Sequence, residues 1–124
     1  MSWLGLLLSD DLIFTSRITG VGRDHGLTVK PARTPDALLE LAGREAPSCV
    51  LLDLGFPGLS VPDLLRRLGE VCPVMPLVVA YGSHVDAAGL RAARAAGCGV
   101  VLPRSAFVEQ LLSKLPEWLS GAGQ

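Results

Sequence analysis

The sequence lacks an excess of charge of one sign. Among its 124 residues, 11 lysines and arginines nearly balance 12 aspartates and glutamates, which gives a formal net charge of −1. A chain without a positive surplus has little general attraction for nucleic acid or for anionic lipid. We therefore expect neither nucleic acid nor a membrane surface as a partner.

The sequence also lacks an apolar run long enough to cross a bilayer. Residues 1–8 are apolar, but they have no basic flank and lead directly into Ser9, Asp10 and Asp11. This pattern favours a first buried strand over a secretory signal peptide. The three cysteines, at positions 49, 72 and 98, have no metal-ligand spacing and lie beside apolar runs. Buried, reduced thiols and a cytoplasmic location are the corresponding expectations.

What the sequence does contain is a regular alternation of two patterns. Hydrophobic residues make up 49% of it and charged residues 19%, as expected of a folded domain. Five apolar runs of strand length, at residues 3–8, 27–31, 49–53, 77–81 and 99–102, alternate with segments of helical periodicity. This order predicts an α/β fold with a five-stranded parallel sheet covered by helices on both faces, in three layers.

Helix start signals precede several of the predicted helices. Thr34 followed by Pro35 is typical of an N-cap and a first helical position, and Ser60 and Ser83 both resemble the start of a capping box. Ser105 is the expected N-cap of the last helix. The glycines at residues 20–22 follow a predicted helix instead of a strand, which favours a helix end over a dinucleotide-binding loop.

Acidic residues follow two of the predicted strands. Asp10 and Asp11 come after the first strand, and Asp53 ends the third. Because the carboxyl ends of adjacent parallel strands meet at one edge, we expect the three carboxylates to converge there. Converging carboxylates need a cation, and oxygen ligands favour Mg²⁺. The alternative is that Asp10 and Asp11 cap the first helix.

The segments at these strand ends resemble the receiver domain of bacterial response regulators, of the chemotaxis-receiver type. Residues 6–18 are similar to the family's first strand, acidic pair and first helix, and residues 50–58 to its phosphoacceptor strand and the Pro-Gly turn after it. Residues 76–81 and 96–102 resemble the fourth strand and the approach to the fifth. The resemblance implies a flavodoxin-like, doubly wound (βα)5 domain over residues 1–120, with residues 121–124 as a flexible tail.

The resemblance also implies roles for individual residues. Asp53 would accept a phosphoryl group from a histidine kinase. Asp10, Asp11 and Asp53, together with the backbone carbonyl of Gly55, would hold Mg²⁺, which neutralises charge on the transferring group.

Three positions depart from the receiver pattern. Arg104 stands where receivers have a lysine, and arginine does not substitute freely for a lysine point charge. Tyr81 stands where they have a Ser or Thr, while Ser83 brings a small hydroxyl two positions late. Val101 replaces the aromatic switch residue. The chemistry at Asp53 is compatible with these changes, but the usual conformational switch is not.

The leading hypothesis is an atypical stand-alone receiver, not an enzyme, that signals through protein–protein contact. The first alternative is a pseudo-receiver that acts without phosphorylation, with Arg104 and the acids in a structural salt-bridge cluster. The second is a small enzyme or cofactor-binding protein on the same sheet. A histidine kinase or another signalling protein is the expected partner. Residues 87–102 and the last helix form the face expected to make a homodimer, with Trp118 as an exposed anchor. The other apolar residues of that helix, Phe107, Leu111, Leu112 and Leu115, are expected to cover the sheet.

Overall fold

The computed structural model describes residues 3–120, and the predicted tail at 121–124 lies outside the described residues. Five strands alternate with five helices in the described chain. The strands are β1 (Leu4–Leu8), β2 (Thr28–Ala32), β3 (Cys49–Asp53), β4 (Leu77–Gly82) and β5 (Val100–Pro103). The helices are α1 (Leu12–Asp24), α2 (Pro35–Arg44), α3 (Val61–Val71), α4 (Ala87–Ala96) and α5 (Arg104–Ser120).

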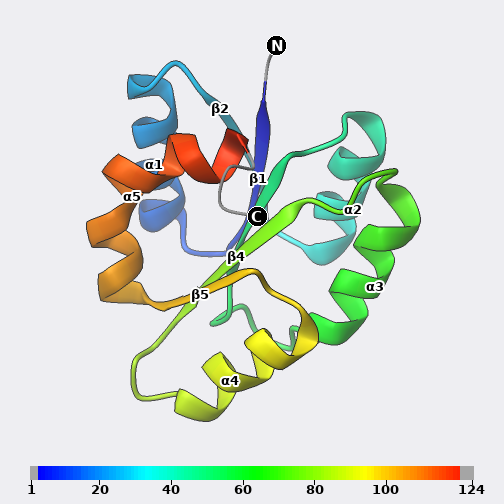
Figure 1. Cartoon of the computed structure of the whole chain (residues 1–124), viewed down its shortest axis with the longest axis vertical. Coiled ribbons are helices and arrows are strands. Elements are labelled where there is room, and N and C mark those ends of the chain that lie inside the picture. The colour runs from blue at the N-terminus through cyan, green and yellow to red at the C-terminus, as the bar shows by residue number, and fades with distance from the viewer. Residues whose placement is uncertain (1–2, 121–124) are drawn as a thin grey trace.

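The strands form one parallel sheet in the order β2-β1-β3-β4-β5, with helices on both sides (Figure 1). One core cluster contains buried residues of α1 and α5, and the other contains those of α2, α3 and α4. The predicted doubly wound, three-layer α/β fold is confirmed. Because β1, β3 and β4 are buried along their whole length, each is a nearly continuous apolar run in the sequence.

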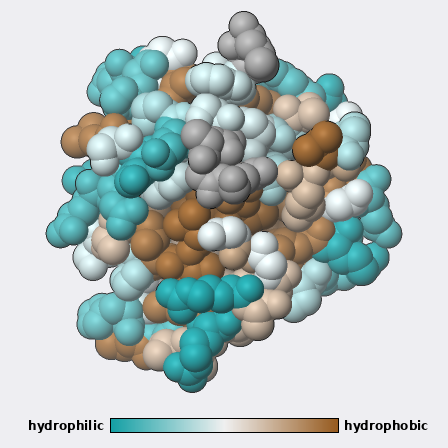
Figure 2. All heavy atoms as spheres, viewed as in Figure 1, coloured by the Kyte–Doolittle hydropathy of each residue, from teal (hydrophilic) through white to brown (hydrophobic). Residues whose placement is uncertain are grey.

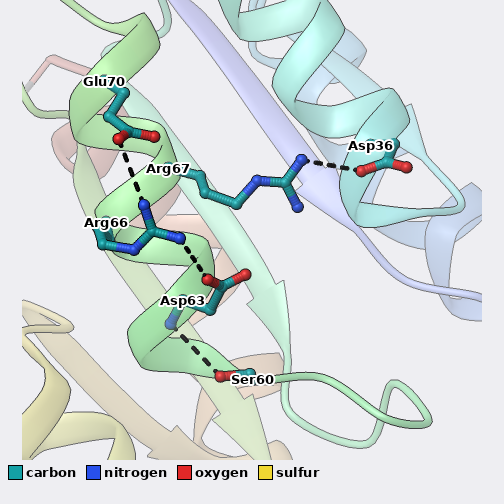
Figure 3. A network of polar contacts seen from close by, with 6 residues as sticks. All are labelled: Asp36, Ser60, Asp63, Arg66, Arg67 and Glu70. Carbon is teal, nitrogen blue, oxygen red and sulfur yellow. Dashed lines mark hydrogen bonds and ion pairs between the residues drawn. The ribbon is translucent and has the colours of Figure 1, made fainter.

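Two of the predicted helix starts are confirmed by their hydrogen bonds. The Thr34 hydroxyl accepts the Ala37 N–H at 3.1 Å, and the Ser60 hydroxyl accepts the Asp63 N–H at 3.4 Å. The Asp63 carboxylate does not complete a capping box, because it accepts a hydrogen bond from Arg66 at 2.6 Å instead. Figure 3 shows this network extending from α3 to the start of α2, where Arg67 contacts Asp36. These charges are exposed, so the network contributes little to stability.

Three of the predicted helix boundaries are wrong. Helix α1 continues through the glycines at 20–22 and ends at Asp24, because Gly22 allows the helix to lie against Val29. Helix α4 starts after Asp86, whose carboxylate accepts the Gly89 N–H, and not after Ser83. Helix α5 begins at Arg104, directly after β5, so Ser105 lies within its first turn and is not its N-cap.

The predicted exposure of Trp118 is also wrong. Trp118 is only 3% exposed and stacks on Phe107, with ring centroids 5.7 Å apart. Residues 107, 111, 115 and 118 follow one stripe of the helix and cover the sheet. Leu112 lies off this stripe and is 63% exposed, contrary to the expectation that it packs on the sheet. The cysteines are buried free thiols, as expected, and burial raises the pKa of Cys98 to about 11.

Candidate functional site at the carboxyl edge of the sheet

The candidate site lies where β1, β3 and β4 end side by side. Asp53 is the last residue of β3 and pairs in register with Tyr81 of β4, while Ser9 follows β1 directly. Ser9 and Asp53 are the buried polar residues of the core, each 2% exposed. The sheet therefore presents a single buried carboxylate at this edge, and neighbouring strands surround it.

Hydrogen bonds hold both oxygens of the Asp53 carboxylate. The Ser9 hydroxyl donates to Oδ2 at 2.8 Å, and the Gly55 N–H donates to Oδ1 at 2.8 Å. These two donors each occupy one lone pair of the buried carboxylate. The Ser9 oxygen in turn accepts the Asp11 N–H at 3.1 Å, which ties the turn after β1 to the same group.

The two acids after β1 have different places. Asp11 is the N-cap of α1, since its Oδ1 accepts the Phe14 N–H at 3.0 Å. Asp10 is exposed and makes no hydrogen bond or ion pair with any of residues 3–120. The capping alternative therefore describes Asp11, although its second oxygen still faces the site. Ser9, which the sequence reasoning did not single out, is the residue after β1 that reaches Asp53.

Arg104 lies between the carboxylates of Asp11 and Asp53. Its Nη1 is 3.6 Å from Asp11 Oδ2, and its Nη2 is 3.9 Å from Asp53 Oδ1. The guanidinium carbon lies 4.8 Å from the centre of the Phe14 ring and 5.8 Å from that of Tyr81. The start of α5 thus places a fixed positive charge over an aromatic floor, beside both acids.

Tyr81 fills the space beneath this cation. Its side chain is fully buried, stacks on Phe107 at 4.4 Å between centroids and packs against Phe14 at 5.3 Å. The hydroxyl has no hydrogen-bond partner among the described residues. Burial, and then the negative charge of Asp53, raise the pKa of Tyr81 well above its usual range.

A cavity of about 290 Å³ opens beside Asp53. It is lined by Asp53, Gly55, Gly82, Ser83, His84, Arg104 and Ser105. Ser83 is exposed at the cavity wall, and its hydroxyl accepts the Val85 N–H at 3.3 Å. The structure therefore brings Asp53, Arg104, Gly55 and Ser83 together around one space, and it leaves Tyr81 behind them in the core.

The arrangement does not fit the divalent cation that a receiver site implies. Gly55 directs its N–H toward Asp53, and that N–H bonds the carboxylate oxygen nearest Arg104. No cluster of three or more metal-ligating side chains exists within residues 3–120. Mg²⁺ in proteins is usually held by one or two carboxylates and several waters, and here Arg104 already lies between the carboxylates of Asp11 and Asp53.

Two curated proteins match the sequence. The transcriptional activator protein ExaE of Pseudomonas putida is 28% identical over 122 residues, which are 95% of this chain and 56% of that protein. The response regulator protein TmoT of Ectopseudomonas mendocina is 30% identical over 80 residues, 64% of this chain and 36% of that protein. The chain therefore spans about half or less of these relatives. No protein-family model matches it.

Solved structures of response regulators and receiver domains are similar to this chain in fold. A CheY-like receiver domain from Methanospirillum hungatei superposes with a TM-score of 0.80 at 19% identity, covering 97% of this chain and 95% of that one. A chain in the co-crystal of the Saccharomyces cerevisiae phosphotransfer protein Ypd1 with the Ssk1 receiver domain gives 0.80 at 17%, covering 99% and 92%. A Burkholderia pseudomallei response regulator with a phosphorylated aspartate and calcium gives 0.73 at 20%, covering 94% and 70%.

The chain has the fold of response-regulator receiver domains, and the resemblance seen in the sequence is confirmed. None of the helices in the described part of the chain is both long and apolar enough to span a membrane.

Proposed function

We propose that this chain is a receiver-type signalling module that acts by binding other signalling proteins and does not depend on phosphorylation of Asp53. The fold supports a role in two-component-type signal transduction. Of the hypotheses that the sequence left open, the geometry of the site favours the pseudo-receiver. Catalysis has no comparable support: Ser83, His84 and Ser105 line the cavity beside Asp53, but no hydrogen bond among the described residues joins either hydroxyl to the imidazole.

The state of the Asp53 carboxylate carries this proposal. Its two oxygens already accept hydrogen bonds from Ser9 and Gly55, and the Arg104 guanidinium balances its charge from 3.9 Å. An attack on a phosphoryl group would have to use a remaining lone pair of these oxygens, beside the Arg104 guanidinium. Its hydrogen bonds and its ion pair join the ends of β1 and β3 to the start of α5, which supports a structural role for this carboxylate.

The aromatic core behind the site supports the same reading. Tyr81 is fully buried and packed between Phe14 and Phe107, so a change of its rotamer would require these rings to move. Val101 is buried on the opposite side of the sheet, in the cluster with α3 and α4. Neither the packed Tyr81 nor the buried Val101 corresponds to the hydroxyl and aromatic residues of the usual receiver switch.

The face of α4, β5 and α5 is the surface that we propose for partner binding. Strand β5 is an edge of the sheet, and its Val100 and Leu102 are half-buried. Figure 2 shows hydrophobic atoms gathered in the middle of this view, between α5 and α4. A histidine kinase, a phosphotransfer protein or a second copy of the chain is the proposed occupant, and an Ypd1–receiver complex is among the structures to which the fold is similar.

The test is intact-mass analysis after incubation with acetyl phosphate and Mg²⁺, with an Asp53→Asn variant beside the wild type. We expect no phosphoryl adduct on either protein. An adduct that forms on the wild type and is lost in the variant would disprove independence from phosphorylation.

That outcome would instead support a second function, a working phosphoacceptor. The cavity of about 290 Å³ beside Asp53 favours it, because Ser83, Arg104 and Ser105 line a space large enough for a phosphoryl group.

A further inference from the structure

We infer that Arg104 is a built-in counter-ion, which takes the place of a divalent cation between Asp11 and Asp53. This inference deepens the proposed function and rests on it. It predicts that the chain assembles its site without Mg²⁺, and that removing the guanidinium turns the same site into one that binds the metal.

The position of the guanidinium is the first support. It contacts Asp11 Oδ2 with one nitrogen and Asp53 Oδ1 with the other, so a single cation joins the ends of β1 and β3. Two carboxylates at one strand edge repel each other unless a positive charge lies between them. Arg104 supplies that charge from the protein itself.

The aromatic ring under Arg104 is the second support. Phe14 belongs to the first turn of α1, and its ring lies under the guanidinium with 4.8 Å between the ring centre and the carbon. Guanidinium groups are weakly hydrated and stack well on aromatic rings. A magnesium ion keeps its water shell and gains nothing from such a surface. The Phe14 ring therefore favours a guanidinium over a hydrated metal ion as the cation at this position.

The remaining donors are the third support. Three of the four carboxylate oxygens of Asp11 and Asp53 accept hydrogen bonds, from Phe14, Gly55 and Ser9. Asp11 Oδ2 is the one left without a hydrogen bond from the described residues, and it faces Arg104. The guanidinium and the hydrogen bonds together stabilise the two acids, and a metal ion would have to displace the guanidinium.

The experiment measures Mg²⁺ and Mn²⁺ binding by isothermal titration calorimetry in the wild type, Arg104→Ala and Arg104→Gln. Arg104→Gln keeps most of the side chain, so it remains informative if the smaller residue disturbs the fold. Arg91→Ala is the matched control, because Arg91 is an exposed arginine of α4 with no ion pair among residues 3–120. Circular dichroism establishes that each variant is folded.

We expect no saturable metal binding in the wild type or in Arg91→Ala. The Arg104 variants should gain a saturable site, with a dissociation constant at least about tenfold below the highest metal concentration at which the wild type shows no binding. The gain should vanish in Arg104→Ala combined with Asp53→Asn. Saturable wild-type binding that requires Asp53, no gain in either Arg104 variant, or a gain that survives the double substitution would each overturn the inference.

These outcomes are separate from those of the phosphorylation test. A wild type that binds no Mg²⁺ but forms a phosphoryl adduct would contradict the proposed function and leave the counter-ion intact. A wild type that binds Mg²⁺ through Asp53 and forms no adduct would contradict the counter-ion role of Arg104 and leave the proposed function intact.

Discussion

The Ser9 hydroxyl makes two hydrogen bonds within the site, although it is one of the smallest side chains there. It lies directly after β1, donates to the buried Asp53 carboxylate and accepts the N–H of Asp11. The sequence gives little sign of this role, because a serine between an apolar strand and two acids has no motif of its own. Asp10 and Asp11 led to the prediction of a metal site, whereas the Ser9 hydroxyl beside them makes the contact with Asp53.

We expect Ser9→Ala to destabilise the fold by about 1–3 kcal/mol, because a buried carboxylate oxygen would lose its donor. Urea unfolding at neutral pH measures this loss. Ser16→Ala is the control, since the Ser16 side chain is exposed on α1, and it should change stability by less than about 0.5 kcal/mol. In an Asp53→Asn background the cost of Ser9→Ala should shrink; an unchanged cost would mean that Ser9 acts through something other than Asp53.

At the scale of elements, the strands were predictable and the helix ends only in part. Strands buried on both faces must be apolar throughout, so their positions follow from composition over a few residues. A cap depends on local backbone geometry that several polar residues in a row can satisfy. After β4, both Ser83 and Asp86 have suitable side chains, and Asp86 is the one with the capping hydrogen bond. No loop separates β5 from α5, because β5 ends at Pro103 and α5 begins at Arg104.

The two neighbouring acids before α1 test this view of caps. Asp11 accepts the Phe14 N–H, whereas Asp10 is exposed and makes no polar contact in the described chain. Asp11→Ala should therefore cost about 1 kcal/mol of unfolding free energy, and Asp10→Ala close to nothing. Thermal unfolding of the two variants makes the comparison. Equal losses would show that general negative charge at the helix start matters, and not the cap.

Helix α5 offers a second comparison within one element. Trp118 is buried against Phe107, and Leu112 is 63% exposed. Trp118→Ala should destabilise the protein by about 3–5 kcal/mol, and Leu112→Ala by less than about 0.5 kcal/mol. Chemical denaturation, followed by far-UV circular dichroism, measures both. A larger loss for Leu112→Ala would mean that this leucine is covered, as it would be at an interface between copies of the chain.

At the scale of the whole molecule, the candidate site is continuous with the aromatic part of the core. Stacked rings run from Tyr81 beneath Arg104 through Phe107 to Trp118 near the end of α5. The sequence indicated which strand ends would meet and that Asp53 would lie among them. It did not indicate that Tyr81 would turn into this stack, because the direction of one aromatic side chain depends on the packing of two helices that are distant in sequence.

This continuity predicts how the molecule responds to alkali. The chain has one tyrosine, so tyrosinate absorbance reports on Tyr81 alone. Burial and the charge of Asp53 raise its pKa in the folded state above the value of about 10 that it has when unfolded. The unfolded state therefore loses the proton first as pH rises. The contribution of Tyr81 to stability should be unchanged below about pH 10 and should fall above it.

We expect tyrosinate absorbance to rise together with the loss of circular dichroism, and not before it. Tyr81→Phe should remove this part of the alkaline destabilisation, and it also removes a buried hydroxyl that has no partner among the described residues. An absorbance increase near pH 10 in a molecule that is still folded would contradict the prediction. It would show that the ring reaches solvent, and that the aromatic stack behind Asp53 opens while the sheet remains intact.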